Sequence, residues 1–108
     1  MQPLGLEGRR SRIAAARAAL VGLAAVLYEA TGPELGELMS AVDGVAAQAA
    51  AARVTITVEA VRRGQVAEEG VNAHAWVRDH APSLRQGGAG DVARVVTAVV
   101  PAGAQFRP

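Results

Sequence analysis

The stretch that decides the fold is Glu34–Arg63, ELGELMSAVDGVAAQAAAARVTITVEAVRR. Its apolar residues recur at spacings of three and four, which is the pattern of one face of an α-helix. That face comprises Leu35, Leu38, Val42, Val45, Ala49, Ala52 and Ile56. A helix over 34–63 would be about 45 Å long, and such a helix depends on tertiary packing for its stability. The pattern therefore predicts one long helix that needs a second apolar surface.

The segment Val54–Val58 within this stretch also fits a β-strand, because apolar and polar residues alternate and all five favour strands. At the helical period, Val54, Val58 and Val61 form an equally regular stripe. The chain offers no second strand-like run, and an unpaired strand would leave its backbone groups without hydrogen-bond partners. We therefore predict that the helix continues through this segment and ends at Gly64.

The residues before this stretch predict an amphipathic helix over 9–30. Its apolar face is formed by Ile13, Ala16, Leu20, Leu23 and Leu27. Gly32 is expected to end this helix in a left-handed conformation, and Thr31 and Glu34 have the spacing of a capping box for the next one. A break this short predicts that the two helices pack antiparallel as a hairpin.

The same N-terminal segment has a second interpretation, as a targeting segment. Four arginines within residues 9–17 precede the apolar run Ala18–Tyr28, as in a signal peptide. The flanks argue against it, because Glu7 dilutes the positive charge and Tyr28-Glu29-Ala30 is a poor cleavage site. The run is also too short to cross about 30 Å of hydrocarbon. We therefore expect a cytoplasmic protein without a membrane partner, and the targeting alternative stays open.

The remainder of the chain predicts two shorter helices, near 73–80 and 91–100. Asn72 is expected to cap the first of them, and Pro101 to end the second. The tail over 101–108 shows no periodicity and is expected to fray.

These elements predict an all-α fold: one domain over 1–108, built from a long antiparallel helical hairpin and two shorter helices. The composition indicates a thin core, because the apolar residues include 25 Ala and 15 Val but one Phe, one Tyr and one Trp. Trp76 is predicted to be a structural anchor, largely buried between the short helices and the end of the long one.

The charge and the residue types exclude several classes of site. Eleven arginines and ten acidic residues give a net charge of +1, which by itself implies neither a nucleic-acid nor a membrane partner. The absence of cysteine excludes disulfides, thiolate metal sites and cysteine nucleophiles. On one helix His74 and His80 would lie about 240° apart, so they cannot share a metal ion. Glu68 and Glu69 are expected to form a solvated acidic turn.

A glycine-rich stretch, GAGDVA over 88–93, matches the dinucleotide fingerprint G-x-G-x-x-A. That fingerprint requires a preceding strand, and none is predicted here. We therefore expect a flexible turn, and altogether no catalytic residue, no metal, no cofactor and no small-molecule ligand.

Five segments carry a family resemblance: ELMSAVD over 37–43, AARV over 51–54, EAVRRG over 59–64, AWVRDHAPSL over 75–84 and VARVV over 92–96. They resemble the domain of unknown function 222 family, an actinobacterial helical region found N-terminal to HNH endonuclease domains. The resemblance covers roughly residues 34–100. Its most distinctive parts are the Arg-Arg-Gly end of the long helix and the Trp-Val-Arg element.

The resemblance implies a non-catalytic N-terminal helical module that positions or dimerises a DNA-acting enzyme. The nuclease centre of the family lies downstream, and Asn72, His74 and His80 cannot assemble one, so no catalytic residue is carried over. Candidate nucleic-acid contacts are Arg62, Arg63, Arg78, Arg85 and Arg94.

The alternative is a standalone helical interaction or oligomerisation protein without a nuclease role. Both interpretations predict a homodimer or a partner helix. The reason is that the small side chains of Ala46–Ala52 leave much of the long helix to be covered.

Overall fold

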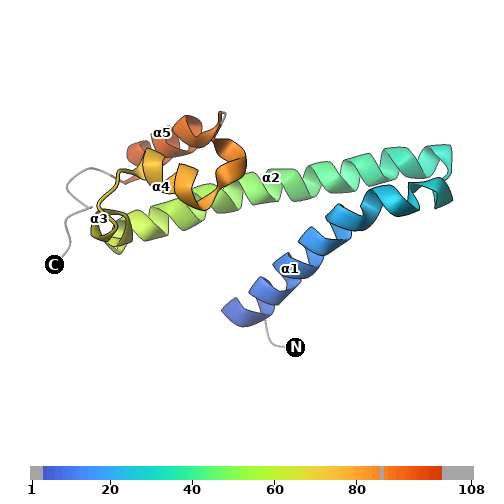
Figure 1. Cartoon of the computed structure of the whole chain (residues 1–108), viewed down its shortest axis with the longest axis horizontal. Helices are drawn as coiled ribbons and strands as arrows, with labels where there is room; N and C mark the ends of the chain where they lie inside the picture. Colours follow the sequence, from blue (N-terminus) through green and yellow to red (C-terminus); the bar gives the residue numbers. More distant parts are fainter. Residues whose placement is uncertain (1–3, 86, 101–108) are drawn as a thin grey trace. The chain divides into compact units, whose positions relative to one another are not determined.

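The computed structural model describes residues 4–85 and 87–100, which form helices joined by short turns (Figure 1). The fold is all-α as predicted, and no strand occurs in the described ranges. The tail expected to fray, 101–108, lies outside them. The chain, predicted to be one domain over 1–108, divides into two compact units, Met1–Ala41 and Val42–Pro108.

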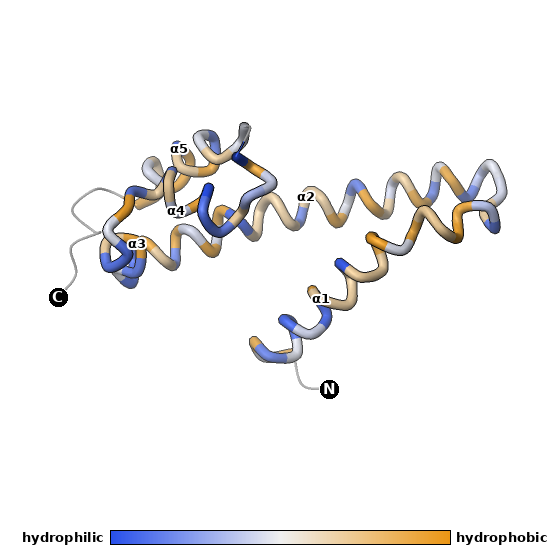
Figure 2. Tube along the Cα trace, viewed as in Figure 1, coloured by the Kyte–Doolittle hydropathy of each residue, from blue (hydrophilic) through white to orange (hydrophobic). Residues whose placement is uncertain are grey.

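The first unit contains α1 (Leu6–Gly22), the 3-10 helix η1 (Leu23–Glu29) and the first turns of α2. The helix predicted over 9–30 therefore begins three residues earlier and tightens at Leu23. Apolar residues concentrate in the part of this segment that leads into η1 (Figure 2). No residue of α1 or η1 is buried by any part of the chain that the structure describes.

The helix α2 (Gly32–Arg62) begins with the predicted capping box. The Thr31 backbone N–H donates to Glu34 Oε1 at 2.9 Å, and the Glu34 N–H donates to Thr31 Oγ1 at 3.3 Å. The expected left-handed Gly32 is wrong, because Gly32 is already the first residue of α2 and has no positive φ. The chain turns instead at Ala30, whose backbone is extended, so the break needs no glycine.

The ambiguous segment Val54–Val58 is helical, as predicted. Thr55 and Thr57 donate their hydroxyls to the carbonyl oxygens of Ala51 and Arg53, at 3.1 and 2.7 Å. These bonds to the preceding turn satisfy both hydroxyls within the helix, and they allow Thr57 to be buried. In the helix, the threonine hydroxyls and the backbone groups of this segment therefore have hydrogen-bond partners. A lone strand would leave its backbone groups without them.

The second unit places four short elements after α2: α3 (Gln65–Glu68), α4 (Ala73–His80), η2 (Pro82–Leu84) and α5 (Ala89–Val99). Gly64 has a φ of 79°, a left-handed conformation that ends α2 at the predicted residue. Asn72 caps α4 as predicted, with its Oδ1 accepting from the Ala75 N–H at 2.8 Å. The last helix begins at Ala89 instead of 91, because Ala89 is buried and the turn comes at Gly88.

The core of the second unit is built almost entirely of valine. Val61 at the end of α2, Val66 in α3, and Val96 and Val100 at the end of α5 form one buried cluster. Partly buried side chains surround it: Val54, Val58, Ala60, Val71, Ala73, Trp76 and Val92. In Figure 1, α4 and α5 accordingly lie along the C-terminal half of α2. The antiparallel packing of the two long helices stays a prediction.

The valine core predicts a sharp contrast between two neighbours on α5. Val96 is 2% exposed and Val95 is 48% exposed. Val96→Ala removes two buried methyl groups and should lower the free energy of unfolding by about 1.5–3 kcal/mol. Val95→Ala, the matched control, should change it by less than about 0.5 kcal/mol. Urea unfolding followed by circular dichroism measures both, and equal effects would contradict the core assignment.

Candidate functional site

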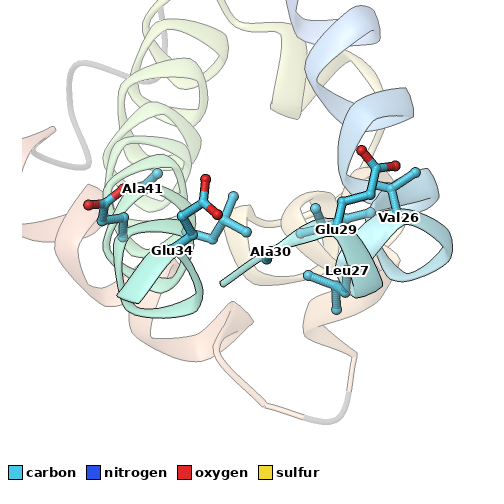
Figure 3. A pocket seen from close by; sticks show the side chains of 9 residues that line it. Val26, Leu27, Glu29, Ala30, Glu34 and Ala41 are labelled. Atoms are coloured by element: carbon cyan, nitrogen blue, oxygen red, sulfur yellow. The ribbon is translucent and has the colours of Figure 1, made fainter. Parts of the chain in front are cut away.

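A concave surface lies within the first unit, where η1 turns into α2. This acidic cleft has a volume of about 520 Å³ and is lined by Leu23, Val26, Leu27, Glu29, Ala30, Glu34, Glu37, Leu38 and Ala41. Figure 3 shows Glu29 and Val26 on η1 and Glu34 on the first turn of α2, with Ala30 between them. Apolar side chains and three carboxylates thus share one open surface, a combination suited to a ligand that is both basic and apolar.

The carboxylates of the acidic cleft differ in their availability. Glu34 holds the capping box, and the backbone N–H and the hydroxyl of Thr31 keep the pKa of this carboxyl below its ordinary value. Its Oε1 is therefore committed to Thr31. Glu29 and Glu37 form no ion pair with any residue in the described ranges. Two of the three acidic side chains are consequently available to a partner.

A stripe of exposed apolar side chains runs along α1 and η1, and its last residue, Leu27, also lines the acidic cleft. Ile13 is 70% exposed, Leu20 43% and Leu27 38%, and each follows the previous one by seven residues. Residues seven apart lie on nearly the same side of an α-helix, which places Ile13 and Leu20 together on α1, and Leu27 follows on the tighter 3-10 helix η1. Because nothing in the described chain buries this stripe, it is an apolar surface of the kind that marks protein or membrane contacts.

The segment Leu6–Glu29 is also long and apolar enough to cross a membrane, by length and composition alone. The sequence prediction excluded a spanning helix because the apolar run Ala18–Tyr28 is too short. The helical segment in the structure is longer, with 24 residues. Signal sequences near an N-terminus and core helices of other proteins share these properties. The expectations of a cytoplasmic location and of no membrane partner stay predictions.

The second unit contains a polar cluster centred on Glu69. The carboxylate accepts from Gln65 Nε2 at 2.9 Å and from the Trp76 indole Nε1 at 3.1 Å, both at Oε2. Its Oε1 lies 3.1 Å from His80 Nε2. Since a carboxylate only accepts, the hydrogen of this bond belongs to the imidazole. The rings of Trp76 and His80 also contact one another, with centroids 4.6 Å apart.

These bonds hold the pKa of Glu69 well below its ordinary 4.5, at about 2. The side-chain hydrogen bond from Gln65 contributes most, followed by those from His80 and Trp76. The Glu69 side chain is 33% exposed. Glu68 and Glu69 are exposed, as predicted for a solvated acidic turn, but the Glu69 carboxylate also joins the end of α3 to one face of α4.

Trp76 is half-buried against the valine core, with its indole N–H directed to Glu69. Beside it lies a shallow groove of about 130 Å³ lined by Arg53, Ile56, Thr57, Trp76, Val77, His80 and Ala81. This placement agrees with the predicted packing role, although part of the ring stays accessible.

The five candidate DNA-contacting arginines are all exposed, but the structure does not join them into one site. Arg63 pairs with Glu59 and Arg94 with Asp91. Arg85 Nε donates to the Arg78 carbonyl at 3.3 Å, which is a hydrogen bond between two members of the set. Two of the five positive charges are thus already compensated by neighbours on their own helices.

The described residues contain no group of three or more histidine, aspartate or glutamate side chains that could hold a metal ion. His74 and His80 lie on α4 as predicted, and His80 is occupied by Glu69.

Sequence reasoning missed both the acidic cleft and the Glu69 cluster. A signal for the cluster exists, because Trp76 and His80 are four residues apart and so share one face of α4. The cleft had a weaker signal, the absence of any basic residue between Ala18 and Ala52 while three glutamates flank the turn at Thr31.

Comparison of the chain with protein-family models, with curated proteins and with solved structures found no match. The function is therefore argued from the geometry above and from the resemblance stated for residues 34–100.

The Glu69 cluster predicts an acid-sensitive contact that Trp76, the chain's single tryptophan, reports. Because the pKa of Glu69 is lowered from 4.5 to about 2, the carboxylate stabilises the fold above about pH 4.5. That contribution is lost as the pH falls through about 2. The Trp76 emission should therefore stay native near pH 3.5 and change near pH 2.

Glu69→Gln should remove this step and alter the emission already at neutral pH, whereas the neighbouring Glu68→Gln is the matched control. A transition centred near pH 4.5 in the unsubstituted protein would contradict the hydrogen-bonded carboxylate.

Proposed function

We propose that this chain is a non-catalytic helical interaction module that associates with a partner through its first unit. The observation that carries the proposal is the complete lack of buried residues in α1 and η1 within the described chain. An isolated helix of this length is marginal in water, so most of its stability has to come from packing. A partner that covers the exposed stripe would supply it.

The distribution of apolar side chains supports this proposal. In the second unit, valine at helical spacing is buried by four short elements. More apolar side chains are exposed in the first unit, namely Leu4, Leu6, Ile13, Leu20, Val21, Val26, Leu27, Leu35 and Met39, than in the second, namely Val45, Ile56, Val95 and Val99. Such a concentration of exposed aliphatic side chains in one unit is typical of an interaction surface.

The resemblance adds a place for such a module, at the N-terminal side of an HNH endonuclease domain. In that setting the second unit presents Arg62 and Arg78 at its surface, and the first unit brings two copies together. The standalone interaction protein without a nuclease role is the alternative. An in-frame HNH motif beyond codon 108 would favour the first, and a stop codon would favour the second.

Self-association is tested by one substitution on the exposed stripe. Leu20→Asp places a charge at the middle of the exposed stripe and should convert an associating species into a monomer, as measured by sedimentation from low to high micromolar concentration. The native Trp76 emission of the second unit should be retained, because Leu20 lies in the first unit and is not buried within the chain. Val95→Asp on α5 has similar exposure and should leave the association unchanged. An unsubstituted chain that is monomeric throughout would contradict the self-association.

A non-catalytic role predicts that the purified chain does not cleave plasmid DNA with magnesium, manganese or zinc. Supercoiled, nicked and linear forms on a gel provide the measurement. Cleavage that survives purification and disappears in His74→Ala or His80→Ala would overturn this assignment.

A further inference from the structure

We propose that the acidic cleft of one copy receives the basic arm of a second copy, and that the exchange is reciprocal. The basic arm is the first part of α1, Arg9–Arg17, which carries Arg9, Arg10, Arg12 and Arg17. This inference rests on the proposed self-association and specifies its partner, its orientation and its register.

The apolar surfaces of the basic arm and the cleft are complementary in kind. The cleft presents Leu23, Val26 and Leu27 from η1 and Leu38 from α2. The basic arm presents Ile13, which is 70% exposed, and Leu20 follows the arm on the same helix. A helix with one aliphatic stripe can lay that stripe into such a cleft, which removes apolar surface from water on both copies.

The charges of the two surfaces are opposite. Residues 6–17 hold four arginines and one glutamate, whereas residues 18–52 hold no basic residue and four acidic ones. Glu29, Glu34 and Glu37 line the cleft itself. A copy therefore has a positive end and a negative end within one unit, and two copies match only when the positive end of each meets the negative end of the other.

The contacts made within the basic arm leave most of this charge available. Arg10 lies 3.7 Å from Glu7 in an exposed i,i+3 pair, and Arg9 Nε donates to the Leu4 carbonyl. Exposed pairs of this kind contribute little. Arg12 and Arg17 form no ion pair with the described residues.

Within the first unit, Glu29 and Glu37 are the carboxylates that neither pair with a described residue nor hold a helix cap. A second copy provides them to the basic arm.

The positions of the stripe residues fix the register. In an antiparallel pair centred on Leu20, each Ile13 lies opposite the partner's η1 close to Leu27, since Ile13 is seven residues before the centre on α1 and Leu27 is seven after it on the tighter η1. The same register sets the segment Arg9–Arg12 opposite Tyr28–Thr31, which contains Glu29. Apolar contacts and charge contacts thus agree on one twofold arrangement, the symmetry most common among homodimers.

Charge reversal tests the electrostatic part of this inference. Variant A carries Glu29→Arg and Glu37→Arg, and variant B carries Arg9→Glu and Arg12→Glu; Glu34 is left intact because it caps α2. Each variant alone should dimerise with a dissociation constant raised about tenfold or more, since like charges then face one another. An equimolar mixture of A and B should recover association as a heterodimer, and the chain with all four substitutions should recover it as a homodimer.

A matched control makes the same change of charge elsewhere. Glu68→Arg with Asp79→Arg alters two exposed acidic residues of the second unit and should leave the dimer unchanged. Raising the salt concentration to 0.5 M should weaken the unsubstituted dimer, because screening reduces the attraction between exposed charges.

Engineered cysteines test the orientation without interference, because the chain has none of its own. Ala16 and Ala24 lie four residues to either side of Leu20 and are exposed. In the antiparallel register, Ala16→Cys chains should form disulfides with Ala24→Cys chains when the two are mixed, and each variant alone should cross-link poorly.

The outcomes separate this inference from the proposal on which it rests. Suppose that Leu20→Asp dissociates the dimer, but that cysteines cross-link 16 to 16 and 24 to 24, or that charge reversal has no effect. The reciprocal arrangement would then be overturned, and the interaction module would be retained. A monomer at all concentrations would overturn the reciprocal arrangement and the self-association, but would not exclude an interaction module for a different partner. A monomer that sediments with vesicles of anionic lipid would instead assign the basic arm to a membrane surface.

Discussion

The valine cluster at the end of α2 is the packing interaction on which the rest of the second unit depends. Val61, Val66, Val96 and Val100 come from three different helices, and each is buried by the others. The helices α3, α4 and α5 are too short to be stable in isolation. They are helical because their apolar sides close over this cluster. Where aromatic residues are scarce, β-branched valine at helical spacing provides a core that is thin but continuous.

The first unit shows what the same composition does without such a cluster. Its apolar residues are spread along α1 and η1, and alanines separate them, so the described chain buries none of them. The cost of leaving aliphatic side chains in water is the physical reason to expect a partner. The segregation of charge along this unit then gives the partner an orientation, because the arginines precede the apolar stripe and the glutamates follow it.

The polar groups of the molecule are satisfied mostly within a few residues of themselves. Thr55, Thr57 and Thr97 donate to the carbonyl one turn earlier, and Asn72 caps its own helix. Among the described residues, no buried side-chain nitrogen or oxygen lacks a hydrogen-bond partner. The Glu69 cluster reaches further, since it joins residues seven and eleven positions apart, and Arg53 donates to Ser83 Oγ thirty positions away. It therefore fixes the turn between α3 and α4 as well as satisfying its own charge.

The sequence by itself determined the all-α class, the capping box at Thr31 and the end of α2 at Gly64, because each depends on residues within one helical turn. It left Val54–Val58 open between strand and helix, and an argument about missing strand partners was needed to choose. Only the tertiary structure decided that Glu69 is held by Trp76 and His80, that α5 begins at a buried Ala89, and that the residues around Thr31 form a cleft. These features arise when elements distant in sequence or separated by a turn are brought together, and local spacing carries no information about that approach.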